Sequence, residues 1–269
     1  MAAVGRSARA VAVVQLASIV AVLLSSPPAA AASCPQLESI VRSSVQAALQ
    51  REIALAAGLI RIFFHDCFPQ ARTLIIYTSI YYLDSLAPAP ESLVNELPGP
   101  GSSSVRQLIN LFGSRGMGDA ADLVALSGGH TVGRSQCGFV RPQDDSFSRK
   151  MAANCSADPN RKQDLDVITP VTFDNGYYMA LTRSQGVFTS DMALIRDQAT
   201  APIVRRFAQD KAAFFAQFTK SMIKLSKVPR PGGNVGEIRR NCFRSNRPRL
   251  VDAAATFASE QEEGFAAFA

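Results

Sequence analysis

Apolar residues recur at the spacing of an α-helix along most of this chain, and this pattern constrains its fold more than any other feature. Pro35 is suited to the first turn of a helix. After it, residues 37–49 place their apolar side chains on one helical face. Residues 52–68 give a second, wider apolar face. Further helices are predicted over residues 105–112, 120–126, 173–181, 201–209 and 211–225. Because these parts lack the alternation typical of strands, we predict a mainly α fold.

Three features lie outside this helical pattern. Residues 87–104 are rich in Pro, Gly and Ser and predict a loop, and the glycine pair at 128–129 is expected to close the helix before it. Residues 71–83, with the sequence ARTLIIYTSIYYL, are dense in β-branched and aromatic residues and resemble a strand. A buried helix is the alternative for this segment, because a short apolar run fits both structures.

The N-terminus has the organisation of a secretory signal peptide. Basic residues at Arg6 and Arg9 precede an apolar stretch over residues 10–24. Small residues at 29–32 offer a cleavage site, so we predict a signal peptide over residues 1–32 and an oxidising compartment. A membrane anchor is the alternative, although the stretch is shorter than the about 20 residues that a span needs.

The formal net charge is +6, of which the two arginines of residues 1–32 contribute two, and the remaining positive charge is mild and scattered, so we expect no nucleic-acid partner. It is compatible with weak attraction to acidic wall polysaccharide.

Histidine and cysteine are scarce enough to limit the chemistry. The chain has two histidines, and His65 follows Arg61 by four positions, so both share a face of the second predicted helix. This pair could accept a proton and stabilise negative charge, or it could be an unrelated surface pair. His130 follows an apolar helix and two glycines, and it could bind a metal or be a hydrogen-bonded core histidine. The five cysteines are Cys34, Cys67, Cys137, Cys155 and Cys242.

Two long motifs in order carry a family resemblance. Residues 59–68, LIRIFFHDCF, and residues 122–133, DLVALSGGHTVG, resemble the distal and proximal signatures of the plant secretory (class III) haem peroxidases. Further landmarks of that family match at residues 97–100, 172–175, 189–191 and 240–242. The similarity covers residues 33–70 and 84–246. It implies a haem-peroxidase fold in which two helical halves sandwich the haem.

The resemblance implies roles for the motif residues around a b-type haem. His130 would be the axial ligand of the iron, and Asp191 would accept its other ring N–H and make the ligand more anionic. His65 would take a proton from hydrogen peroxide and return it to the leaving oxygen, while Arg61 stabilises the separating charge. Phe64 would limit access to the haem.

The resemblance also implies a substrate entrance, an ion site and partners. Pro98 would line the entrance for phenolic donors, which give up single electrons to the haem. The ligands of a proximal calcium ion would be Thr131, Asp166, Thr169, Thr172 and Asp174. The partners are then hydrogen peroxide and phenolic small molecules, and the protein is expected to be a monomer without membrane attachment.

The chain departs from the family pattern at one place. Residues 71–83 replace a longer helical stretch, so part of the distal half is expected to be missing. Three of the family's cysteines are lost with it. By correspondence Cys137 and Cys155 pair with each other, and the cysteines expected to lose their partners are Cys34, Cys67 and Cys242. Asp66 is what remains of a distal calcium site, where we expect poor binding.

The chain is thus expected to comprise a signal peptide, a peroxidase domain over residues 33–246 with an aberrant junction at 71–83, and a C-terminal extension over 247–269. We predict a peroxidase secreted to the cell wall. In some relatives such an extension directs the protein to the vacuole, and a disordered tail or a read-through product is the alternative here. The alternative to an active enzyme is an inactive or unstable pseudo-peroxidase made from an aberrant transcript.

Overall fold

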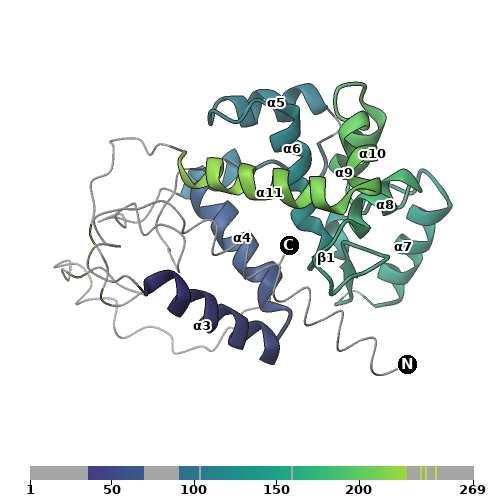
Figure 1. The fold of residues 1–269 in the computed structure, drawn as a ribbon. Coiled ribbons are helices and arrows are strands. Elements are labelled where there is room, and N and C mark those ends of the chain that lie inside the picture. Colours follow the sequence, from purple (N-terminus) through teal and green to yellow (C-terminus); the bar gives the residue numbers. More distant parts are fainter. Residues whose placement is uncertain are drawn as a thin grey trace.

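Helices dominate the computed structural model, as the apolar spacing predicts (Figure 1). The structure describes residues 36–69, 91–102, 104–158 and 160–228, together with Glu237, Arg240 and Asn246. The helices are α3 (Leu37–Arg51), α4 (Leu55–Cys67), α5 (Val105–Gly113), α6 (Ala120–Ser127), α7 (Ser146–Ala157), α8 (Gly176–Thr182), α9 (Thr189–Arg196), α10 (Ala201–Gln209) and α11 (Lys211–Ser226). Three short 3₁₀ turns are η1 (Glu91–Glu96), η2 (Gly128–Thr131) and η3 (Cys137–Phe139).

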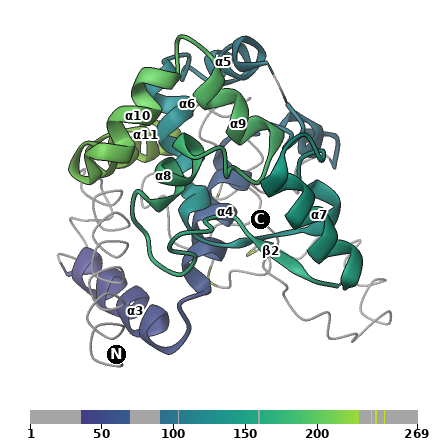
Figure 2. The ribbon, with the colours of Figure 1, turned by 90° about the vertical axis from the view of Figure 1, so that its right-hand side faces the viewer.

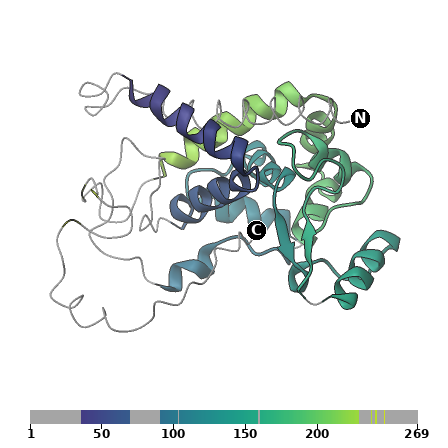
Figure 3. The ribbon, with the colours of Figure 1, turned by 90° about the horizontal axis from the view of Figure 1, so that it is seen from below.

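The helices α6, α8, α10 and α11 pack into one group, with α9 against α10 (Figure 2). Helix α4 contacts both α3 and α11, so it joins this group to the N-terminal part of the described chain. Seen from below, α3 and α4 lie on one side of the molecule and α7 lies on the other (Figure 3). Both η2 and α9, which carry the candidate site, lie against α8.

The core of the helical group is aromatic. Tyr178, Phe207 and Phe214 pack edge-on or tilted with ring centroids 5.0 to 5.9 Å apart, and all three are buried. A side chain at Gly128 would meet Tyr178 and Phe214, since a Cβ there would lie 2.2 Å from the Tyr178 hydroxyl. Helix α6 ends at Ser127 and Gly128 is its C-cap, so the glycine pair closes the helix as predicted. Gly128 has a right-handed φ of −63°, the chain continues into η2, and close packing explains the glycine.

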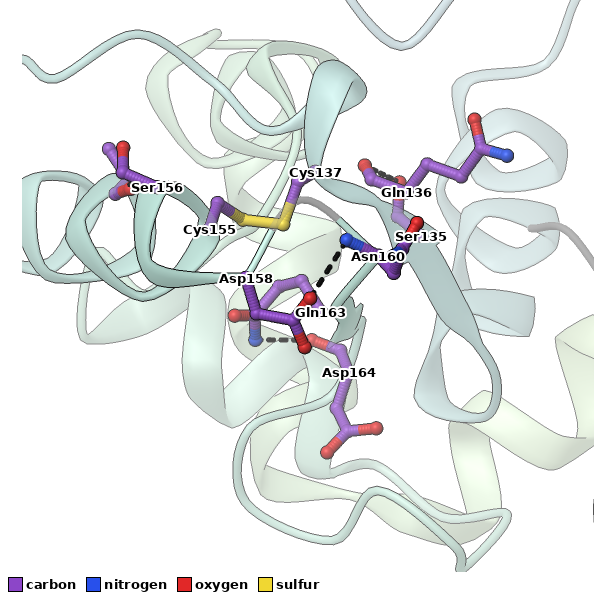
Figure 4. The surroundings of a disulfide bond; sticks show 10 residues. Ser135, Gln136, Cys137, Cys155, Ser156, Asp158, Asn160, Gln163 and Asp164 are labelled. Carbon is purple, nitrogen blue, oxygen red and sulfur yellow. Dashed lines mark hydrogen bonds between the residues drawn. A yellow bond between two sulfur atoms is a disulfide. The ribbon is translucent and has the colours of Figure 1, made fainter.

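A small antiparallel sheet stands beside α7, and the sequence pattern did not predict it. Strand β1 (Arg134–Gln136) pairs with β2 (Lys162–Asp164), and Ser135 lies opposite Gln163. Each strand has three residues, too few for alternation to be recognised. The predicted Cys137–Cys155 disulfide is confirmed, and it ties η3 to α7 with the Cα atoms 5.5 Å apart (Figure 4).

Several helix ends differ from the predicted ones for local reasons. Helix α4 begins at Leu55 rather than at residue 52, because Glu52 is extended and ends α3. The helix expected from residue 173 begins at Gly176, and a 3₁₀ turn lies within the predicted loop at 87–104. Helices α7 and α9 were not predicted. A capping box between Asp145 and Ser148 starts α7, whose apolar periodicity is weak.

Four predictions fall on residues outside the described part of the chain. These are the signal peptide over 1–32, the segment 71–83, the extension 247–269, and the fate of Cys34 and Cys242. Cys67 is described, and it is buried at the end of α4. No helix in the described ranges is both long and apolar enough to cross a lipid bilayer.

Candidate active site

Arg61 and His65 stand one turn apart on α4, as their spacing predicts. The Nε atom of Arg61 donates a hydrogen bond to Nε2 of His65 over 3.3 Å, and both side chains are half-buried. Burial, and secondly the positive charge of Arg61, lowers the pKa of His65 from 6.5 to about 4. At neutral pH His65 is therefore a neutral imidazole that can accept a proton.

His130 lies in the η2 turn, where a second pair forms across the fold. Its Nδ1 atom is 2.9 Å from Oδ1 of Asp191, which comes from the first turn of α9. The Asp191 side chain is 1% exposed and the His130 side chain is 33% exposed. A buried carboxylate that accepts the Nδ1 proton leaves Nε2 as the ring nitrogen with a lone pair, which is the state of a metal-binding histidine.

Asp191 has two further partners that sequence reasoning missed. The hydroxyl of Tyr177 donates to the same oxygen, Oδ1, over 2.8 Å, and the backbone N–H of Phe188 donates to Oδ2 over 2.9 Å. The rings of Phe188 and Tyr177 lie edge-on to His130, with centroids 5.2 and 5.8 Å from its own. Burial, and then the charge of Asp191, raises the pKa of Tyr177 well above 10, so its hydroxyl stays protonated.

The Arg61–His65 pair on α4 lies close to the η2 turn that carries His130. A Cβ built on Gly129 would lie 3.3 Å from Cγ2 of Ile60. The residue before His130 therefore lies against the residue before Arg61, and the glycine allows this close approach of η2 to α4. The fold thus holds the His130 turn against the helix that carries His65.

Next to the two histidine pairs, a cluster of side-chain oxygen atoms includes the hydroxyl of Thr131, the residue that follows His130. The hydroxyl of Thr131 donates to Oδ2 of Asp166 over 2.9 Å, and the hydroxyl of Thr169 lies 2.9 Å from Oδ1 of Asp174 and 3.2 Å from the same Asp166 oxygen. Burial raises the pKa of Asp166, and the nearby charge of Asp174 adds to the effect. A Cβ at Gly176 would lie 2.2 Å from the Thr169 hydroxyl oxygen, so only glycine leaves this cradle open.

The donor set of this cradle suits calcium. Carboxylate and hydroxyl oxygens are the ligands that a hard cation prefers, and a cation would relieve the repulsion between two close carboxylates. Within the described ranges, no three or more His, Cys, Asp or Glu side chains cluster as a metal site, so threonine oxygens would have to complete this one. Thr172 joins the same turn through its backbone N–H, which donates to the carbonyl of Thr169 over 2.9 Å.

The remaining predicted site residues lie around these groups. Phe64 stacks on Phe68 with ring centroids 4.8 Å apart and is edge-on to His65. Asp66 is buried on α4. Pro98 is half-buried in the segment after η1, and two residues later the carbonyl of Pro100 accepts a hydrogen bond from the N–H of Ser190. That bond ties the Pro98 segment to the start of α9, next to Asp191.

Arg141 is another residue that the sequence did not single out. Its side chain is 2% exposed and donates to the carbonyls of Gly186 and Ser184 over 2.8 and 3.0 Å, and it also pairs with Asp144 and Asp145. It thereby fixes the segment that leads into α9. The acidic pair three and four positions after Arg141 was the available sequence signal.

Comparison with known proteins agrees with this geometry. A family model described as peroxidase matches residues 83–210. The chain is 31% identical to Cationic peroxidase SPC4 of Sorghum bicolor over 80% of each sequence, and 31% identical to Peroxidase 2 of Oryza sativa subsp. japonica over 80% of this chain and 90% of that one. It is 30% identical to Peroxidase 12 of Arabidopsis thaliana over 86% of this chain and 84% of the relative.

A mainly helical protein with these matches is a haem peroxidase. The chain belongs to the class III plant peroxidase family. The predicted fold class and peroxidase function are confirmed, and the family implies haem, typically calcium, and hydrogen peroxide with small-molecule donors as substrates. Relatives in this family are typically secreted. The internal deletion at residues 71–83 stays a prediction.

Proposed function

We propose that this protein reduces hydrogen peroxide with single electrons from phenolic donors, using His65 and Arg61 on one face of a b-type haem and His130 on the other. The observation that carries the proposal is the state of the chain's two histidines. His130 is held through Nδ1 by a buried carboxylate, and His65 is kept neutral beside a guanidinium. These are the forms that an axial ligand and a proton acceptor require.

On the His130 side, the protein fixes a ligand. Asp191 accepts the Nδ1 proton, so the ring keeps one tautomer and presents Nε2 with increased electron density. The rings of Phe188 and Tyr177 pack edge-on against the imidazole. When bound there, haem supplies the electron transfer that the side chains themselves cannot perform.

On the His65 side, the protein moves a proton. With haem present, His65 would accept a proton from one oxygen of hydrogen peroxide and return it to the other oxygen as the O–O bond breaks, so that this second oxygen would leave as water. Arg61 stabilises the negative charge that develops on the leaving oxygen. Over the whole cycle, one hydrogen peroxide takes up two electrons and two protons, which two phenol molecules supply, and two waters form.

The other predicted residues support this site. Phe64 limits access on the His65 side, and Pro98 lines the entrance for phenolic donors. One calcium ion is bound by Thr131, Asp166, Thr169, Thr172 and Asp174, while Asp66 alone holds a distal ion poorly. Because Thr131 follows His130 directly, calcium there stabilises the turn that carries the ligand.

The wider setting follows from the family and from the charge of the chain. We propose a secreted monomer of the cell wall, with weak attraction to acidic wall polysaccharide through its positive charge. The vacuolar alternative depends on residues 247–269, which lie outside the described part of the chain.

The test is reconstitution of the recombinant chain with haemin and calcium, followed by oxidation of guaiacol with hydrogen peroxide. We expect a Soret band and turnover, and a loss of about 10²–10⁴-fold in His65→Ala. Arg61→Leu should lose activity, whereas Arg51→Leu, the same change at an exposed position of α3, should not. A Soret band without turnover would identify an inactive haem-binding protein, and failure to take up haem would overturn the proposal.

A further inference from the structure

We infer that Tyr177 is a positioning residue that limits how strongly Asp191 attracts the Nδ1 proton of His130. The inference deepens the proposed function, since it rests on His130 as the haem ligand. Asp191 Oδ1 is shared by two donors, the Nδ1–H of His130 at 2.9 Å and the hydroxyl of Tyr177 at 2.8 Å. Two donors of similar length on one oxygen compete for the same negative charge.

The surroundings of Asp191 hold its carboxylate in place between these two donors. Its other oxygen, Oδ2, accepts the backbone N–H of Phe188 over 2.9 Å, which holds the plane of the carboxylate. The Asp191 side chain is 1% exposed and Tyr177 is 1% exposed. In so dry a setting, water does not replace a lost donor, and each hydrogen bond is stronger than it would be in solvent.

The consequence for His130 has a definite sign. A hydrogen bond from a neutral hydroxyl stabilises the carboxylate charge and makes Oδ1 a weaker acceptor for a second donor. With the Tyr177 hydroxyl present, the imidazole therefore keeps more of its own proton and less electron density reaches Nε2. Removal of the hydroxyl should shift the imidazole toward imidazolate character.

Tyr178 provides a control within the same helix. It is also buried, and its hydroxyl donates to the backbone carbonyls of Val124 and Ala125 over 2.9 and 3.4 Å rather than to Asp191. Tyr177→Phe and Tyr178→Phe each delete one buried hydroxyl together with the hydrogen bonding of that hydroxyl. Neither change alters the shape of α8. A merely structural role for Tyr177 predicts the same spectroscopic outcome for both variants.

The experiment compares the two variants by ¹⁵N NMR of the histidine rings, first without haem. The chain has two histidines, so His65→Gln assigns the signals. At a pH where the ¹⁵N shifts identify a neutral His130 ring, we expect the Nδ1 proton of His130 to move downfield in Tyr177→Phe and to stay in place in Tyr178→Phe. Equal shifts in both variants, or no shift in Tyr177→Phe, would overturn the inference.

Two further measurements separate this inference from the proposed function and from misfolding. In haem-loaded protein, Tyr177→Phe should lower the midpoint potential relative to both wild type and Tyr178→Phe, because a more anionic ligand favours the oxidised iron. Incorporation of 3-fluorotyrosine into Tyr178→Phe makes Tyr177 a stronger donor without deleting it, and should move the His130 proton upfield. The NMR result decides the inference even if the protein takes up no haem.

Discussion

The Nδ1 atom of His130 lies 2.9 Å from Oδ1 of Asp191, across 61 positions of the chain. This bond joins the η2 turn, which packs against α4, to the first turn of α9. One end of the pair is buried and the other is partly exposed. The buried Asp191 therefore fixes the orientation of the His130 ring through Nδ1, and Nε2 is the nitrogen left to bind a metal.

The first prediction concerns the charge of Asp191. Asp191→Asn keeps the shape of the side chain but removes the negative charge that supports His130, so haem affinity or activity should fall about 10–100-fold. Haemin titration followed at the Soret band measures the affinity. Asp197→Asn, at the end of the same helix, changes the same charge away from His130 and should have little effect. Equal losses in the two variants would contradict a specific role for Asp191.

The second prediction concerns pH. Since the pKa of His65 is lowered to about 4, the imidazole stays neutral above that pH and becomes protonated below it. The rate constant for reaction with hydrogen peroxide should therefore be flat near neutral pH and fall as the pH drops through about 4. Stopped-flow kinetics across this range measure it. A midpoint near the ordinary value of 6.5 would contradict the buried, neutral state.

Arg61 provides the matched variant for that pH profile. Its charge is the second cause of the lowered His65 pKa, so Arg61→Leu should move the midpoint of the residual reaction upward. Arg51→Leu should leave the midpoint where it is. A downward shift in Arg61→Leu would show that the two side chains do not interact as the 3.3 Å contact indicates.

The third prediction concerns the ion cradle behind His130. Gly176→Ala would place a Cβ 2.2 Å from the Thr169 hydroxyl and 2.5 Å from an Asp166 oxygen, so we expect a loss of stability of about 1–3 kcal/mol. The stabilisation that added calcium gives should also be smaller in Gly176→Ala than in the wild type. Urea unfolding with calcium or with EDTA measures both effects.

Gly58→Ala is the control for this change, because Gly58 lies inside α4 and a Cβ there meets nothing within 4 Å. It should stabilise the protein by about 0.5–1 kcal/mol and leave the calcium effect intact. A calcium response in Gly176→Ala equal to that in Gly58→Ala would place the ion elsewhere.

The fourth prediction concerns the disulfide. The Cys137–Cys155 bond closes a loop with a sequence separation of 18, and replacing both cysteines by serine should cost about 2–4 kcal/mol of unfolding free energy. Urea unfolding of the double variant measures the loss. Added reductant should destabilise wild type more than the variant, and an equal response would show that this bond contributes little.

Much of the fold could be predicted from local patterns. Helices α10 and α11 were predicted to within one residue, because their long apolar faces and the aspartate that caps α11 are visible in the sequence. The Arg61–His65 pair also followed from spacing alone, since four residues make one turn. Local spacing predicts contacts within one helix because helix geometry is fixed.

Contacts between distant segments did not follow from the pattern. Nothing periodic links His130 to Asp191, and the family resemblance supplied that pair. Tyr177 was missed because tyrosine in an apolar helix looks like core, and its hydroxyl partner comes from another element. The end of α6 at Gly128 followed from the glycine pair, but the close packing of Gly128 against Tyr178 and Phe214 did not, because it exists only in the folded chain.

The most direct test of the central claim separates the roles of the two histidines. Haemin titration and hydrogen-peroxide kinetics would be measured on the calcium-loaded full chain, on His130→Ala and on His65→Ala. We predict that His130→Ala loses haem binding, while His65→Ala keeps its Soret band and affinity but reacts with peroxide about 10²–10⁴-fold more slowly. Loss of haem binding in His65→Ala with binding retained in His130→Ala would contradict the account.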